Sequence, residues 1–273
     1  MKRLTFYFRA TLVLLWLAIA TIATSIWMIF HPNERENADR YWLDWWQKGI
    51  PKIVPVKFIV EGKEYIDAVR PVVYVSNHQH LLDALMIAQV YPLRTLVVAK
   101  KELKKIPLAG YIFDKAGNLF IDRSDREAAI AMLNDFAKRM REEGLNLWVL
   151  VEGHRNRGQQ GLLPFKKGAF YTAIQLQVPI VPVVFGPSYQ QLDIQSGNLN
   201  GGVVYIRVLE PIPTEGLTTN DVEPLLQTTY HRMLAAYQEL EAKTYGGNAA
   251  NIGSQKAQSG SRRAGAQVSS SRR

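Results

Sequence analysis

Between about residues 50 and 245, short apolar runs alternate with longer amphipathic stretches. Apolar residues at helical spacing predict helices over 81–90, from a capping box at 124–127 to Gly144, over 166–177 and over 221–243. Short strands that alternate with helices predict an α/β fold, with a mostly parallel sheet flanked by helices. The runs rich in apolar and β-branched residues, which we expect to be the strands, cover 53–60, 72–75, 95–99, 119–121, 147–151, 180–185 and 203–209.

The first 48 residues have a different pattern. Residues 10–30 contain no charged side chain, and these 21 residues would cross the roughly 30 Å of hydrocarbon in a bilayer. The run is longer than the apolar core of about 7–15 residues in a secretory signal. Residues 41–48 then place three tryptophans and a tyrosine beside charges, as at a membrane–water interface. We expect residues 1–48 to be a membrane-anchoring helical segment, either one span or a helix pair that enters the bilayer and returns.

Composition and charge separate a folded body from its ends. A hydrophobic content of 47% excludes a mainly disordered chain, and the absence of cysteine excludes a disulfide scaffold and a cysteine nucleophile. Of the net charge of +9, residues 1–10 carry +3 and residues 246–273 carry +5, which leaves +1 for the body. Basic ends suit anionic lipid headgroups better than nucleic acid. We expect a domain over 49–245, a disordered basic tail over 246–273 and no nucleic-acid partner.

Polar side chains follow several of the predicted strands. In a largely parallel sheet, ligands bind beyond the carboxyl ends of the strands, so these side chains are expected to share one site. The candidates are His78 and Asp83 after the second strand, Lys100 after the third, Arg123 after the fourth, and Glu152, Gly153 and Arg155 after the fifth.

His78 and Asp83 are the candidates for a general base and its partner. They lie five positions apart, whereas contact on one continuous helix needs three or four. Pairing therefore requires His78 in the turn before the helix, with Ser76 or Asn77 as the N-cap. A carboxylate that holds one ring nitrogen raises the basicity of the other, so this pair can take a proton from a hydroxyl.

The basic candidates suggest an anion site next to that base. Arg123 and Arg155 fit a fork for phosphate, with Lys100 as an added point charge, although salt bridges are the alternative. Lys166 and Lys167 open a predicted helix, where solvated side chains are the alternative to a ligand site. His78 and His80 also form an H-x-H pair, but a metal would need more ligands, with His154 or Glu152 as candidates; we expect no metal.

Four ordered blocks resemble the 1-acylglycerol-3-phosphate acyltransferase family. The N-H-x4-D block stands at 77–83, and a Gly-x-x-Phe-Ile-Asp-Arg block stands at 117–123. The third block, Glu-Gly-Thr-Arg-Ser in the family, is Glu-Gly-His-Arg-Asn at 152–156, and a hydrophobic block with prolines stands at 178–183. The segments 99–107 and 163–168 also match. The replacements at His154 and Asn156 bear on the acceptor headgroup rather than on the fold.

The resemblance implies an enzyme of phospholipid biosynthesis that is bound to a membrane, at the cytoplasmic face of the inner membrane. It would move a fatty acyl group from acyl-CoA or acyl-carrier protein to the sn-2 hydroxyl of lysophosphatidate, giving phosphatidic acid without a cofactor. His78 would be the base and Asp83 its partner. The substrate would contact Arg123, Glu152, Gly153, Arg155 and Lys100. Another acceptor, such as glycerol-3-phosphate or another lysolipid, and a non-catalytic lipid-binding protein are the alternatives.

Overall fold

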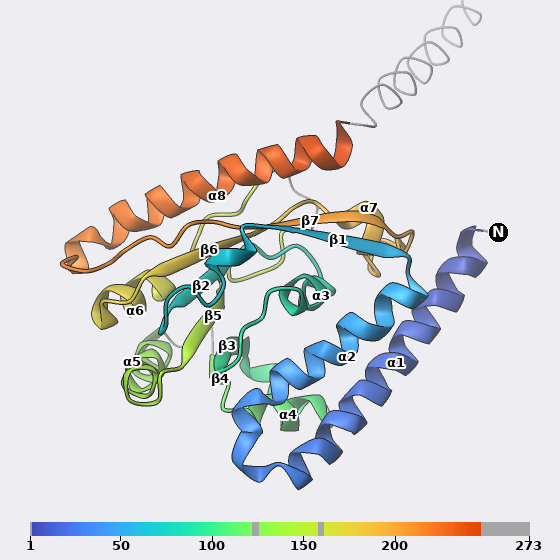
Figure 1. Cartoon of the computed structure of the whole chain (residues 1–273), viewed down its shortest axis with the longest axis horizontal. Helices are drawn as coiled ribbons and strands as arrows, with labels where there is room; N and C mark the ends of the chain where they lie inside the picture. Colours follow the sequence, from blue (N-terminus) through green and yellow to red (C-terminus); the bar gives the residue numbers. More distant parts are fainter. Residues whose placement is uncertain (1, 122–125, 158–160, 247–273) are drawn as a thin grey trace, which may run out of the picture.

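The computed structural model describes residues 2–121, 126–157 and 161–246, and it confirms the expected α/β fold (Figure 1). Seven strands form one sheet in the order β1-β7-β6-β2-β5-β3-β4. All neighbours are parallel except β6 and β7, which are antiparallel. The strands are β1 (Val56–Glu61), β2 (Val73–Ser76), β3 (Thr95–Lys100), β4 (Leu119–Ile121), β5 (Asn146–Leu150), β6 (Ile180–Phe185) and β7 (Gly202–Val208).

Helices cover both faces of the sheet. Side chains alternate between the two faces along each strand, and here both sets are apolar and need to be buried. On β2, Val73 and Val75 belong to the core that includes residues of α5 (Arg126–Glu143), α6 (Gly168–Leu176) and α8 (Val222–Tyr245). Tyr74 belongs to the opposite core, which includes residues of α1 (Lys2–Phe30), α2 (Ala38–Ile53), α3 (Asp83–Ala88) and α4 (Ala109–Lys115). The remaining helical segments are α7 (Tyr189–Leu192) and the 3₁₀ turns Pro32–Asn37, Lys63–Tyr65, Lys101–Lys105 and Thr219–Asp221.

Several predicted boundaries are wrong, and each has a local cause. The first strand begins at Val56 rather than at residue 53, because α2 continues to Ile53. The helix expected over 81–90 is only Asp83–Ala88, because residues 77–82 form the loop that carries the site. The expected capping box at 124–127 lies partly outside the described residues, and the described helix α5 begins at Arg126.

Helices α1 and α2 pack side by side against the domain (Figure 1). Trp16 Nε1 donates to the Trp45 carbonyl at 2.8 Å, and Trp42 Nε1 donates to Thr21 Oγ1 at 3.2 Å. At the other end of α1, the Arg9 guanidinium donates to the Leu199 carbonyl at 2.7 Å. Residues 3–30 have the length and composition of a membrane-crossing helix, but α1 is packed on the body rather than separated from it.

We expect Gly49→Ala to separate α1 from α2. An added Cβ at Gly49 would lie within 1.9–2.5 Å of three Trp16 ring atoms, where no side-chain atom fits. Overpacking of this kind costs about 1–3 kcal/mol of unfolding free energy, measured by thermal or denaturant unfolding in detergent. In a Trp16→Ala background the added methyl group no longer meets the ring, so the same change should not lower the unfolding free energy. Alanine also favours a helix more than glycine does. An equal cost in both backgrounds would show that the Trp16 contact is not the cause.

A buried carboxyl group joins α2 to the edge of the sheet. Asn118 Nδ2 donates to Asp39 Oδ2 at 2.6 Å, and Asn118 Oδ1 accepts the Val97 N–H at 2.7 Å. Burial raises the pKa of Asp39 to about 7, although hydrogen bonds with Asn118 and Tyr91 oppose the rise. Asp39 therefore favours its neutral form in the folded protein.

We expect Asp39→Asn to remove part of the pH dependence of stability. Between pH 3.8 and about 7 the unfolded carboxyl is ionised while the folded one keeps its proton, so folding loses free energy as the pH rises. Asparagine stays neutral, and its amide oxygen can still accept from Asn118. Relative to the wild type, the variant should therefore gain a few kcal/mol across this window, measured by denaturant unfolding. Asp44→Asn, at a half-buried carboxylate of the same helix that is paired with Arg40, is the control, and equal pH slopes in the two variants would contradict the assignment.

Candidate active site

The structure brings His78 and Asp83 together at the carboxyl end of β2. His78 Nδ1 lies 2.6 Å from Asp83 Oδ2, and the Asp83 side chain is only 3% exposed. Because an ionised carboxylate only accepts hydrogen bonds, Nδ1 carries the hydrogen and Nε2 has a free lone pair. Among the described residues Nε2 has no hydrogen-bond partner, and the His78 side chain is 16% exposed. This geometry suits a base that faces the edge of the sheet.

Asp83 also organises the loop before α3. Its Oδ2 accepts the Gln79 N–H at 2.6 Å, and its Oδ1 accepts the His80 N–H at 3.1 Å. Asp83 is the first residue of α3, so His78 precedes the helix, as the five-residue spacing requires. The expected N-cap at Ser76 or Asn77 is wrong, since the cap position is Leu82.

Two side chains that were not among the candidates hold the His78 loop against the end of β6. Asn77 donates to the Phe185 carbonyl at 2.9 Å and accepts the Phe185 N–H at 2.8 Å. Gln79 donates to the Phe185 and Gly186 carbonyls at 2.9 and 2.7 Å. Both side chains are buried. A sequence signal for this role exists. Two amide side chains follow an apolar strand closely, at a position where buried backbone groups need hydrogen-bond partners.

Glu152 connects the third block to the His78 loop. It is fully buried, and its two oxygens accept the backbone N–H groups of His78 at 3.1 Å and Leu163 at 3.0 Å. Burial raises the pKa of Glu152 to about 7, against the lowering effect of these two hydrogen bonds. The main chain adds a further contact, from the Asn156 N–H to the His78 carbonyl at 2.7 Å. The described contacts of Glu152 are thus with the protein's own backbone.

The predicted anion-binding residues are placed unequally. Gly153 has φ +72°, in the region that favours glycine, and Arg155 is half-buried. The residues after Arg155 are hydrogen-bonded to the His78 loop, since the Asn156 N–H donates to the His78 carbonyl at 2.7 Å and the Arg157 N–H donates to the Gln79 carbonyl at 3.2 Å. Lys100 is exposed at the end of β3, with its Nζ 3.2 Å from Glu102 Oε1. Arg123 lies outside the described residues.

His80 is committed to the interior rather than to a metal. It is 2% exposed, its Nε2 lies 2.8 Å from Ser188 Oγ, and its Nδ1 accepts the Leu82 N–H at 3.2 Å. Both ring nitrogens therefore have protein partners. His154, the other histidine of the site sequence, is exposed.

A cavity of about 220 Å³, lined by polar and charged residues, opens beside the His78 loop. Gln79 and His80 of the His78 loop line this cavity, so the cavity lies at the carboxyl edge of the sheet. Its lining residues are Gln79, His80, Arg157, Asp193, Gln195 and Ser196.

Comparison with known proteins assigns the family. The sequence profile of the Acyltransferase family matches residues 57–186, which carry the His78 loop, Glu152 and β6. Human 1-acyl-sn-glycerol-3-phosphate acyltransferase beta is 35% identical over 236 residues, which are 86% of this chain and 84% of the human protein. The chain belongs to this acyltransferase family.

Other members of the acyltransferase family agree with that assignment. Human 1-acyl-sn-glycerol-3-phosphate acyltransferase alpha is 39% identical over 193 residues, covering 70% of this chain and 68% of its own length. The crystal structure of the 1-acyl-sn-glycerophosphate acyltransferase PlsC from Thermotoga maritima superimposes with a TM-score of 0.66 at 25% identity. That match covers 88% of this chain and 95% of PlsC, so the shared fold extends beyond the segment 57–186.

Proposed function

We propose that this acyltransferase moves a fatty acyl group from acyl-CoA or acyl-carrier protein to the sn-2 hydroxyl of 1-acylglycerol-3-phosphate, giving phosphatidic acid. The observation that carries the proposal is the His78–Asp83 pair, with an unpartnered Nε2 at the carboxyl edge of the sheet. The names of the similar human and Thermotoga proteins supply the acceptor.

The chemistry needs a base but no protein nucleophile, because the thioester of the donor is already activated. The acceptor hydroxyl would give its proton to His78 Nε2 while its oxygen attacks the thioester carbonyl carbon. The new C–O bond forms, the C–S bond breaks, and the proton passes from His78 to the leaving thiolate. Asp83 stabilises the transient imidazolium through Nδ1. The scheme balances without a cofactor or a metal.

The anion site for the acceptor phosphate would include Arg155, Gly153, Lys100 and Arg123. Arg155 has the best support for this role, since it is half-buried and the N–H of the next residue, Asn156, donates to the His78 carbonyl. Glu152 would act by position, because its oxygens hold the backbone of His78 and Leu163. A base and a cation on two hydrogen-bonded loops can orient the glycerol phosphate part of the acceptor.

A transfer assay over paired donors and acceptors tests this function. Purified full-length protein is incubated with acyl-CoA or acyl-carrier protein and with lysophosphatidate, glycerol-3-phosphate or lysophosphatidylcholine, and products are measured by mass spectrometry. We expect phosphatidate from lysophosphatidate and little product from the other two acceptors. Product from one of the other acceptors alone, or none at all, would contradict the proposal.

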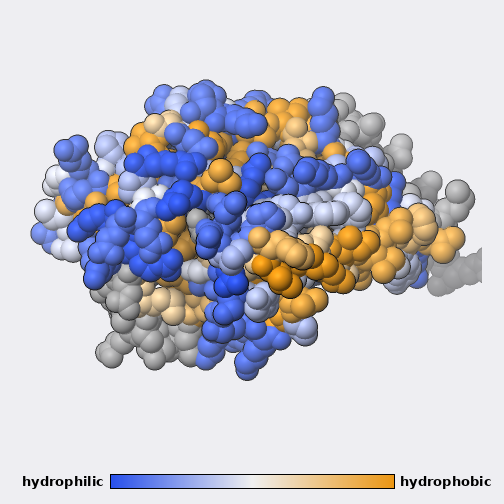
Figure 2. Space-filling view, turned by 60° about the horizontal axis from the view of Figure 1, so that its bottom comes forward, coloured by the Kyte–Doolittle hydropathy of each residue, from blue (hydrophilic) through white to orange (hydrophobic). Residues whose placement is uncertain are grey.

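We also propose that α1 and α2 attach the enzyme to the cytoplasmic face of the inner membrane as a helix pair. Figure 2 shows a hydrophobic band over α1. The basic residues Lys2, Arg3 and Arg9 favour a cytoplasmic N-terminus, and the Arg9 contact with Leu199 keeps that end beside the domain. The exposed apolar side chains of α1 are Leu4, Tyr7, Phe8, Leu14, Leu15, Ile19, Ile22, Ile26, Ile29 and Phe30.

The absence of cysteine makes the membrane proposal simple to test. An environment-sensitive fluorophore on Ile22→Cys should shift to the blue when anionic vesicles are added, because this exposed position would enter hydrocarbon. The same label on Glu142→Cys, at an exposed position of α5, should not change. Equal responses at the two positions would contradict attachment through α1.

A further inference from the structure

Two adjacent lysines at the start of α6 have different surroundings. Lys167 Nζ lies 2.7 Å from Glu223 Oε2, so its charge is paired with a carboxylate of α8. Lys166 is also exposed, but among the described residues no carboxylate forms an ion pair with it. The two side chains therefore offer a matched comparison.

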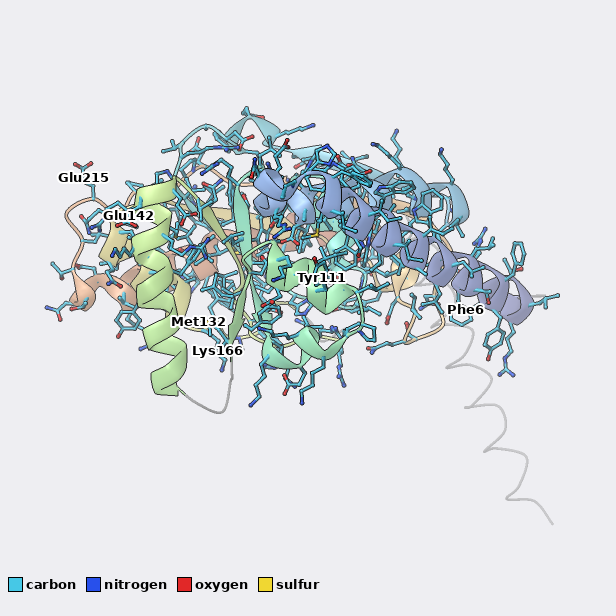
Figure 3. The ribbon with its side chains drawn as sticks, turned by 90° about the horizontal axis from the view of Figure 1, so that it is seen from below. Phe6, Tyr111, Met132, Glu142, Lys166 and Glu215 are labelled. Carbon is cyan, nitrogen blue, oxygen red and sulfur yellow. The ribbon has the colours of Figure 1, made fainter. Side chains whose placement is uncertain are left out.

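The backbone fixes Lys166 beside the third block. Its N–H donates to the Val151 carbonyl at 2.7 Å, directly after β5, and the neighbouring Leu163 N–H donates to Glu152. Residues 163–166 are thus held against the turn at 152–153 by hydrogen bonds at both ends. Figure 3 labels Lys166 near the ends of the strands, in the view from below.

The Lys166 side chain lies over Gly153. A Cβ added to Gly153 would lie 3.1 Å from Lys166 Cγ and 3.4 Å from Lys166 Cε, so the aliphatic stem covers the open face of the glycine. The ammonium is one bond beyond Cε and therefore lies close to the same turn. Glycine at this position accommodates φ +72° and also leaves the space that the lysine stem occupies.

This turn is also the one that holds His78. Glu152 accepts the His78 N–H, and the half-buried Arg155 follows Gly153 by two positions. The carboxyl group of Glu152 is turned inward onto two backbone N–H groups, whereas the Lys166 side chain is exposed. Lys166 and Arg155 are therefore two cations that belong to, or lie over, the segment that is hydrogen-bonded to the His78 backbone.

We propose that Lys166 is a specificity-determining residue whose ammonium binds the phosphate monoester of the acceptor together with Arg155. This inference rests on the proposed function and extends it to a residue of the segment 163–168, which the family resemblance did not place in the substrate site. A lysine ammonium is a compact point charge on a flexible stem, which suits a phosphate that must enter and leave. Only two glycerol carbons separate the phosphate ester oxygen from the sn-2 hydroxyl, so one acceptor can contact both the cations beside Gly153 and the base in the adjoining loop.

The test compares Lys166→Met with Lys167→Met in the full-length protein. Methionine keeps an aliphatic stem over Gly153 and removes only the charge. We expect Lys166→Met to raise KM for lysophosphatidate about 10-fold or more, the effect of a lost charge-assisted hydrogen bond. The KM for the acyl donor should stay at the wild-type value. The ratio of kcat/KM for lysophosphatidate to kcat/KM for uncharged monoacylglycerol should fall by a similar factor. Lys166→Arg should restore most of the preference, and Lys167→Met should match the wild type.

The outcomes separate this inference from the function on which it rests. If the wild type does not acylate lysophosphatidate, the proposed function and the role of Lys166 are both contradicted. If the wild type does so and Lys166→Met behaves like Lys167→Met, only the role of Lys166 is overturned. A Lys166→Met variant that loses the same factor on charged and uncharged acceptors, with a lower melting temperature, would show a structural role and would overturn it as well.

Discussion

Replacement of His78 by alanine is expected to lower kcat for phosphatidate formation by about 10²–10⁴-fold, the contribution of a positioned general base. The variant loses Nε2, the ring nitrogen that has no hydrogen-bond partner among the described residues. Binding of lysophosphatidate should change little, because the proposed phosphate contacts come from other side chains. The measurement is steady-state kinetics with purified protein and mass-spectrometric detection of phosphatidate.

Two controls make the His78→Ala result specific. His231→Ala, on an exposed part of α8, should keep the wild-type kcat. The melting temperature of His78→Ala should stay close to that of the wild type, because the His78 backbone contacts to Glu152 and Asn156 do not involve its ring. Turnover close to wild type in a folded His78→Ala protein would end the proposal of a histidine base.

Asp83→Asn is expected to lower kcat about 100-fold or more and to destabilise the fold as well. Asp83 accepts three hydrogen bonds, from the His78 ring, the Gln79 N–H and the His80 N–H. Asparagine has one acceptor oxygen, so its amide group must face a donor in either orientation. A buried donor left without a partner costs about 1–3 kcal/mol of unfolding free energy, and the ring loses the charge that raises the basicity of Nε2.

The Asp83→Asn prediction has two separate readouts. Kinetics measures the loss of kcat, and denaturant unfolding measures the loss of stability. Asp114→Asn, which removes a surface carboxylate paired with Lys104, should leave kcat unchanged. An Asp83→Asn protein with the wild-type kcat would show that the carboxylate does not assist the base.

Much of the fold could be predicted because its signals are local. Each of the seven strands is a short apolar run, and its existence was read directly from the sequence. The antiparallel pairing of β6 with β7 could not be predicted, since the pairing depends on contacts far apart in the chain. The segment that forms α2 was expected to contact the membrane, either at the interface after one span or as the second helix of a pair, because tryptophans beside charges are typical of that interface. Trp42 and Trp46 are buried against the domain, whereas the pattern alone suggested contact with the membrane interface.

The site shows the same division between local and long-range information. The placement of His78 ahead of α3 followed from the spacing to Asp83, which is a local rule. Asn77 was considered only as a helix cap, because its actual partner, Phe185, lies on another strand. The difference between Lys166 and Lys167 depends on Glu223 of α8, which no local pattern reveals.

A double-mutant cycle on the His78–Asp83 pair, with lysophosphatidate as acceptor, tests most directly whether the two side chains act as one base. Residues that act as one catalytic unit have effects that do not add. We expect the double variant, His78→Ala with Asp83→Asn, to transfer acyl groups no more slowly than His78→Ala alone. If the two losses in kcat multiply instead, the carboxylate does not act through the imidazole, and the paired base proposed here would be contradicted.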